Sequence, residues 1–110
     1  MQYVIIGLDG TDNEALDRRL AVREDHLSLG DKMVNKGNMM YGAALLHDDG
    51  TMKGSMLVLD FDTDQDLQNW LDTEPYVVGK VWESIEIHKS NTRNPWQFNR
   101  DEEWYEKNRS

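Results

Sequence analysis

Residues 3–8 of this chain read Tyr-Val-Ile-Ile-Gly-Leu, so apolar side chains occupy both the odd and the even positions. A strand alternates its side chains between the two faces of a sheet, and such a run is typical of a strand that is covered on both faces. The chain must therefore build a sheet with material on each side. This requirement is strict for 110 residues, which can bury one hydrophobic core but not two.

Residues 14–36 carry apolar side chains at helical spacing, which predicts a helix of about six turns. The expected apolar stripe consists of Leu16, Leu20, Leu27 and Val34, flanked by Val22, Leu29 and Met33. Gly37 follows directly, where a left-handed C-terminal cap is favoured.

The rest of the chain predicts a hairpin, a second helix and a last strand. Residues 39–47 and 52–61 are strand-like and flank an Asp-Gly turn. Thr63 begins a capping signal for a shorter helix that ends near residue 72, and residues 81–88 alternate as the last strand. The order β-α-β-β-α-β predicts an α+β, ferredoxin-like plait, in which both helices cover one face of a four-stranded antiparallel sheet.

The second face of that sheet has no cover in this arrangement. Because the first three predicted strands are apolar at both parities, the face would form a large exposed apolar patch. A homodimer that packs two such sheets against each other is the economical solution. We therefore expect the chain to pair with a second copy of itself.

The charge of the chain argues against polyanionic partners. It has 21 acidic and 12 basic residues, a formal net charge of −9, and no basic run longer than Arg18-Arg19. We therefore expect neither nucleic acid nor membrane among its partners. The acidity is local, however, because residues 60–74 hold six acidic and no basic residues, whereas residues 14–36 are neutral overall. The long helix can thus still hold a small anion.

The chain divides into a domain, residues 1–89, and a polar tail, residues 90–110, which we expect to dock on the body or on a partner. The tail is rich in aromatic residues, namely Trp96, Phe98, Trp104 and Tyr105, and disordered segments are poor in them. The chain contains no cysteine and no apolar run near 18 residues. This composition is compatible with a reducing compartment, and we expect a cytoplasmic protein.

Four short motifs together resemble the YciI-like (YCII-related) family. They are R-L-x-V-R-x-x-H-L at residues 19–27, Gly37 ahead of the second strand, Gly54-Ser55 inside the third, and Glu-Pro-Tyr at residues 74–76. Each motif alone is weak, but the four occur in the right order on the right elements. The resemblance covers residues 2–89.

The resemblance implies a dimeric α+β barrel and a histidine–carboxylate pair. The pair would consist of His26 and Glu74, although the family's turn usually carries Asp where this chain has Glu74. The implied activity is proton transfer of a lyase, isomerase or dehydrochlorinase kind on a small anionic or aromatic compound. An imidazole suits this chemistry because its unperturbed pKa lies nearest neutrality.

The residues also allow simpler roles for the pair. His26 lies at the edge of the predicted apolar stripe, so its ring would be half-buried. It would then either exchange protons with a ligand or donate a structural hydrogen bond to a backbone carbonyl. Glu74 would either orient the imidazole or cap the chain turn at Pro75.

Three further residues are candidates for binding the substrate. Arg23 stands one helical turn before His26, where it can hold an anionic group or form an ordinary salt bridge. Gly54-Ser55 in mid-strand indicates either that a ligand or another backbone approaches closely there, or that the strand has a β-bulge. Ser55 could donate a hydrogen bond to such a ligand. Tyr76 would line the same cavity or pack in the core.

The sequence carries no signal for a metal or a cofactor. The histidines lack the spacing of metal ligands. Residues 60–66 resemble the start of a calcium loop, but Gln65 and Leu71 stand where glycine and glutamate are needed. Two hypotheses remain for the function: an enzyme that uses His26 and Glu74, or a non-catalytic module that senses a small ligand through the same cavity. Haem degradation would rest on the fold alone.

Overall fold

The computed structural model describes residues 1–98, 101, 103, 106 and 107, and within them it confirms the predicted element order and the α+β plait. The strands are β1 Gln2–Asp9, β2 Met39–Leu46, β3 Met52–Asp60 and β4 Trp82–Ser90. The helices are α1 Ala15–Lys36, α2 Asp64–Thr73, α3 Pro75–Val78 and the short 3-10 helix η1 Pro95–Phe98. The short helix α3 follows α2 directly, where the sequence predicted a turn.

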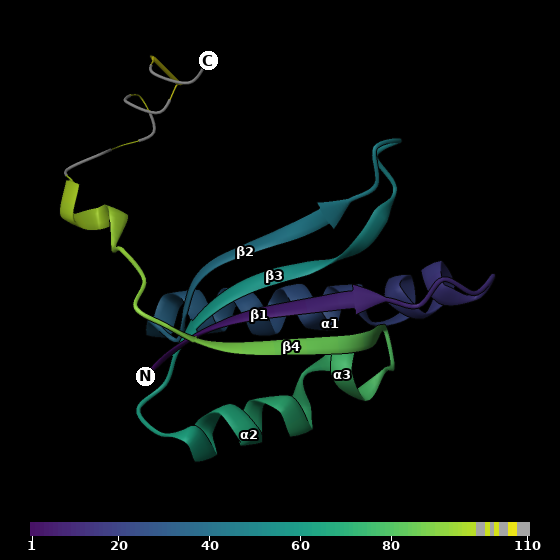
Figure 1. Ribbon diagram of the computed structural model, residues 1–110, viewed down its shortest axis with the longest axis horizontal. Coiled ribbons are helices and arrows are strands. Elements are labelled where there is room, and N and C mark those ends of the chain that lie inside the picture. Colours follow the sequence, from purple (N-terminus) through teal and green to yellow (C-terminus); the bar gives the residue numbers. More distant parts are fainter. Residues whose placement is uncertain (99–100, 102, 104–105, 108–110) are drawn as a thin grey trace.

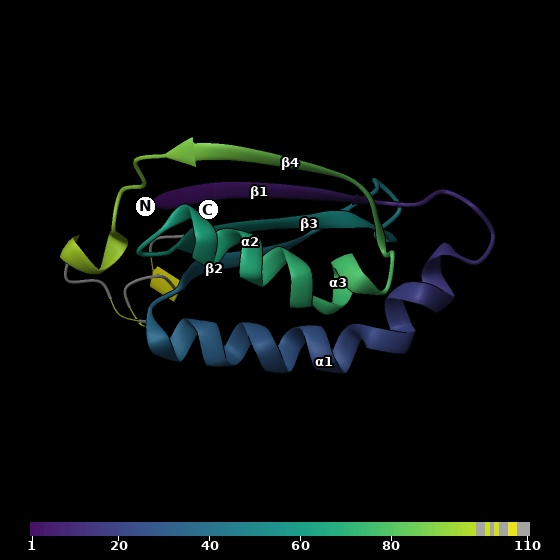
Figure 2. The same ribbon diagram turned by 90° about the horizontal axis from the view of Figure 1, so that it is seen from below.

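The strands form one antiparallel sheet in the order β2-β3-β1-β4 (Figure 1). The two longer helices lie on the same side of this sheet (Figure 2). Between sheet and helices lies the core, in which Ile5 of β1 and Leu59 of β3 are completely buried. The caps are as predicted at two places: Thr63 accepts a hydrogen bond from the amide of Asp66, and Gly37 adopts φ 84°.

The opposite face of the sheet is apolar along β1 and β3 but carries Ser84, Glu86 and His88 along β4, and no described element covers it. The register of β1 with β3 places Val4 beside Val58 and Ile6 beside Met56 on this face. Leu8 continues the row and is 41 % exposed. The expected apolar face is therefore present, and what covers it is taken up below.

Only part of the predicted stripe of α1 faces the core. Leu16, Leu20, Leu27 and Val34 are 44–57 % exposed, whereas Met33 is buried and Val22 and Leu29 pack partly buried against the core. The face turned toward the sheet lies one residue earlier in the repeat than the four leading residues, and it also carries the buried Arg19 and the half-buried His26. Hydrophobicity alone did not identify this face, because these two side chains are polar and pair with buried carboxylates, as described below.

The described part of the tail leaves the body near the N-terminus (Figure 1). The amide of Thr92 donates to Gln2 Oε1, and the exposed Phe98 ring lies near the Arg93 guanidinium. Trp104 and Tyr105 lie outside the described residues, and so does the Trp96 side chain. Docking of the tail stays a prediction.

Among the described residues, no helix is both long enough and apolar enough to span a membrane. That same part of the chain holds no cluster of three potential metal-ligating side chains.

Candidate active site

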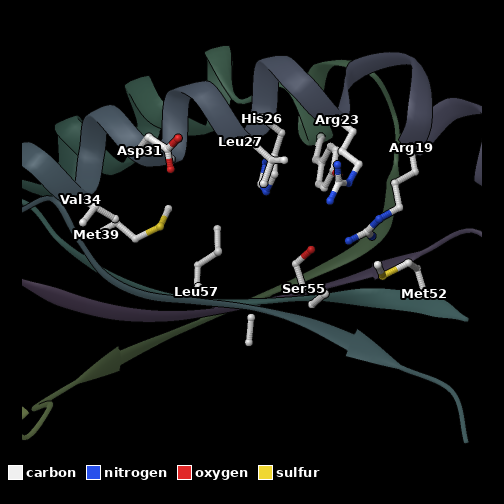
Figure 3. Close-up of a pocket in the computed structure, with 15 residues that line it drawn as sticks. Arg19, Arg23, His26, Leu27, Asp31, Val34, Met39, Met52, Ser55 and Leu57 are labelled. Carbon is white, nitrogen blue, oxygen red and sulfur yellow. The ribbon is translucent and has the colours of Figure 1, made fainter. Parts of the chain in front are cut away.

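A cavity of about 280 Å³ lies between α1 and the strands β2 and β3 (Figure 3). Small residues make the room: Gly42, Ala43 and Ala44 of β2 line it, and Gly30 lines it from α1. A Cβ atom on Gly30 would meet only the flexible Met39 side chain, at 3.8 Å. Gly30, a costly residue inside a helix, thus borders an open space.

His26 and Glu74 form a close pair at this cavity. His26 Nδ1 lies 2.5 Å from Glu74 Oε1, and the two side chains are 12 % and 2 % exposed. His26 lines the cavity, whereas Glu74 lies behind it and does not. In the tautomer with hydrogen on Nδ1, this nitrogen donates a hydrogen bond to the Glu74 carboxylate, and Nε2 is the nitrogen able to exchange a proton with a ligand.

Glu74 is held in place by the local backbone. It is the N-cap of α3, and its Oε1 also accepts a hydrogen bond of 2.8 Å from the amide of Tyr76. Pro75 at the first position favours helix start, because proline has no amide hydrogen to leave unpaired there. The two roles considered for Glu74 are therefore combined in one oxygen atom: it caps the turn and it holds the imidazole.

Tyr76 lies between two side chains of α1, His26 and Arg19. Its ring stacks on the His26 imidazole with centroids 3.7 Å apart and planes 3° apart. The Arg19 guanidinium carbon lies 4.9 Å from the same ring centroid. Because the imidazole fills one face of the ring, the guanidinium occupies the other. Arg19 and His26 are seven residues apart, about 10.5 Å along the helix, which leaves room for one ring between them.

The Tyr76 phenol is a neutral group in this setting. Burial raises its pKa, and the positive charges of Arg19 and Arg23 oppose that rise. Tyr76 is 1 % exposed and lines the cavity, so the packing role and the lining role both apply.

Ser55 is oriented by Trp82 from across the sheet. The indole Nε1 of Trp82 on β4 donates to Ser55 Oγ on β3 at 3.3 Å. The indole reaches Ser55 by crossing β1 at Gly7, where a Cβ atom would lie 2.3 Å from the ring. Since Ser55 Oγ accepts from Trp82, its own hydroxyl hydrogen remains for another acceptor. The neighbouring Gly54 leaves room for the Gly7 carbonyl of β1, 2.3 Å from where its Cβ would be.

Arg19 is a cavity residue that the sequence analysis did not single out. It is 4 % exposed and makes two hydrogen bonds, of 2.7 and 3.0 Å, to the buried carboxylate of Asp9 at the end of β1. Its place in the R-L-x-V-R-x-x-H-L motif, seven residues before His26, is the signal that could have identified it. Arg23, by contrast, is exposed and makes no ion pair within the described part of the chain.

Four of the five predicted site residues line the cavity, namely Arg23, His26, Ser55 and Tyr76, and the fifth, Glu74, supports His26 from behind. Arg23 and Arg19 point from α1 toward the sheet near Ser55 (Figure 3). The arrangement can hold an anion and move a proton.

Comparison with known proteins is consistent with this geometry. The family model described as YCII-related domain matches residues 1–91. The chain is 29 % identical over 93 residues to Protein YciI of Escherichia coli O6:H1 (strain CFT073), an alignment that covers 79 % of this chain and 93 % of the relative. Protein YciI of Shigella flexneri gives the same values.

Among solved structures, the chain is similar to the 5-chloro-2-hydroxyhydroquinone dehydrochlorinase TftG of Burkholderia phenoliruptrix AC1100, in complex with 2,5-dihydroxybenzoquinone. The TM-score is 0.70 at 17 % sequence identity, over 83 % of this chain and 94 % of the other. At this identity the likeness shows a shared fold.

Proposed function

The chain belongs to the family of YCII-related domains, and on that premise we propose that it is an enzyme that moves a proton on a small anionic or aromatic compound. The observation that carries the proposal is the 2.5 Å contact of His26 Nδ1 with Glu74 Oε1, because it leaves the second ring nitrogen at the cavity.

In this proposal His26 is the general acid or base and Glu74 orients it. The buried carboxylate fixes the tautomer with hydrogen on Nδ1, so that Nε2 carries the lone pair that takes the proton. When Nε2 is protonated, the imidazolium forms an ion pair with the buried Glu74 carboxylate, which stabilises the protonated ring. Stacking on Tyr76 prevents the ring from rotating out of this position.

Arg23 and Ser55 bind the substrate in this scheme. The exposed guanidinium of Arg23 at the cavity attracts an anionic group, and the Ser55 hydroxyl, held by Trp82, donates a hydrogen bond. The substrate would thus be fixed beside the imidazole with its reacting hydrogen toward Nε2, which is the arrangement that proximity effects require.

The dehydrochlorinase of the same fold supports the class of reaction. Its name describes removal of the elements of HCl from a chlorinated hydroxyhydroquinone, and such an elimination requires a group that takes or gives a proton. An equivalent lyase-like or isomerase-like reaction on a phenol, quinol or enolate would suit the cavity described here.

We also propose that the chain is a homodimer through the open face of the sheet. The rows of Val4, Ile6 and Leu8 on β1 and Met56 and Val58 on β3 present apolar side chains there. Packing two such faces together removes them from water, which favours association by about 25 cal/mol for each Å² of apolar surface buried. The cytoplasmic location stays a prediction from the lack of cysteine.

A turnover screen tests the proposed activity. The purified protein is incubated with a panel of chlorinated hydroquinones and hydroxyquinols, and chloride release and absorbance are followed. On any compound that is turned over, His26→Gln should lower kcat by about 10²–10⁴-fold. His47→Gln, in the exposed hairpin turn, is the matched control and should leave the rate unchanged.

Two results would contradict the enzymatic assignment. A His26→Gln variant as active as the parent would remove the imidazole from the mechanism. Compounds that bind at the cavity without any turnover would favour the alternative function, a non-catalytic module that senses a small ligand.

A further inference from the structure

The charges around the cavity leave one positive charge without a partner. Arg19 is neutralised by Asp9, and His26 faces Glu74. Arg23 has no such carboxylate within the described residues. A bound group with a single negative charge would therefore complete the balance at this end of the cavity.

Beside the positive charge of Arg23, Arg19 offers a hydrogen-bond donor. The Arg19 residue is 4 % exposed, and its Nη1 donates to Asp9. Its Nε–H is buried but has no hydrogen-bond partner in the structure. A buried N–H that lacks a partner costs free energy, and a ligand that accepts from it removes this cost. Arg19 lines the cavity (Figure 3), and because its Nε is itself sealed from solvent, a ligand reaches this donor when the guanidinium turns toward the cavity.

The other end of the cavity is apolar and carries a negative charge. Met39 and Leu57 provide apolar walls there, and Asp31, eight residues after Arg23 on α1, adds a carboxylate. Figure 3 shows Asp31 beside Val34, away from the two arginines. No described residue pairs with Asp31. A second negative charge on a ligand would therefore meet repulsion at this end.

We propose that the cavity selects a small monoanion with a flat apolar body: its anionic group binds Arg19 Nε–H and Arg23, and Asp31 at the far end rejects dianions. The inference builds on the proposed function, since it names the class of substrate for the same site and assigns Arg19 to its binding. The anionic group is a carboxylate, phenolate or enolate, which offers a planar acceptor to guanidinium groups.

The test is a binding experiment that needs no turnover. Calorimetry or protein-observed NMR measures the Kd of benzoate, of the neutral isostere benzamide and of the dianion terephthalate. Benzoate should bind at least about tenfold more tightly than either of the others, as expected when one charge-assisted hydrogen bond is lost or one repulsion is added. Equal binding of benzamide, or no binding of benzoate, would overturn the proposal.

Variants then assign the effect to residues. Arg23→Gln should weaken benzoate about tenfold, and Arg19→Lys should weaken it to a similar degree while keeping the charge opposite Asp9, so that the fold is retained. Arg18→Lys, on the exposed Asp12 pair, is the matched control. Asp31→Asn should improve terephthalate binding and leave benzoate binding unchanged. If neither Arg19→Lys nor Arg23→Gln affects benzoate, the proposed anion site is wrong.

The two proposals fail separately. Selective benzoate binding without any turned-over compound would leave the anion site intact and contradict the enzyme. Turnover that depends on His26, together with equal binding of benzoate and benzamide, would do the reverse.

Discussion

The substitution Gly7→Ala should disrupt the contact between the sheet and the site. In the structure, an alanine Cβ at residue 7 would lie 2.3–2.6 Å from three indole atoms of Trp82. No real Cβ contact is that short, so the indole would have to move. It would then lose its hydrogen bond to Ser55 and its edge-on contact with the His26 ring, whose centroid lies 6.0 Å from that of the indole.

The expected cost follows from three contributions. Overpacking a core position costs about 1–3 kcal/mol, and losing the hydrogen bond of Trp82 costs about 0.5–1.5 kcal/mol. Replacing a strand glycine by alanine also stabilises the folded state by about 0.5–1 kcal/mol, because alanine reduces the conformational entropy of the unfolded chain. The net loss in free energy of unfolding is about 0.5–4 kcal/mol, and for a domain of this size each kcal/mol lowers the Tm by about 4–8 °C.

Urea denaturation of parent and variants at one protein concentration measures this loss. Gly30→Ala is the matched control, because the same chemical change on α1 meets only open space and Met39. It should stabilise the protein by about 0.5–1 kcal/mol through helix propensity. In a Trp82→Leu background the penalty of Gly7→Ala should largely disappear. Equal midpoints for Gly7→Ala and the parent would refute the reasoning.

Two other predictions concern charge and assembly. The pKa of the Asp12 carboxyl is lowered from 3.8 to about 2, chiefly by the hydrogen bond from Arg18, so the pair should stabilise the fold above about pH 4 and lose this contribution as the pH falls through 2. Arg18→Gln should therefore lower the denaturation midpoint much more at pH 6 than at pH 2, where about half of the Asp12 carboxyl is protonated in the folded protein, and an equal effect at both would contradict this. Ile6→Lys, on the open face of the sheet, should turn the dimer into a monomer in sedimentation experiments, whereas Gln68→Lys on the helix side should not. A parent that sediments as a monomer would dismiss the proposed interface.

The fold was predictable because its signals are local. The Asp-Gly turn, the cap at Thr63 and the alternation of residues 81–88 each specify a short segment, and their order specifies the plait. The helix α3 was missed because Pro75 was interpreted as the end of one helix. It is also a favoured first residue of another.

The site was only partly predictable because its pairs are distant in sequence. His26 and Glu74 are 48 residues apart, and only the family resemblance joined them before the structure did. The face of α1 was misplaced for a related reason. The burial of Arg19 depends on Asp9, a residue at the end of another element, and no hydrophobicity pattern within the helix records such a partner.

The two roles of Glu74 Oε1, in capping α3 and in holding the imidazole, matter when related sequences are compared. One oxygen both caps α3 and holds the imidazole, so selection for a stable fold would by itself retain an acid at this position, even in a lineage that had lost its chemistry. The imidazole at position 26 packs on Tyr76 but caps no helix. For the proposed proton transfer, the histidine is therefore the more informative of the two residues when related sequences are compared.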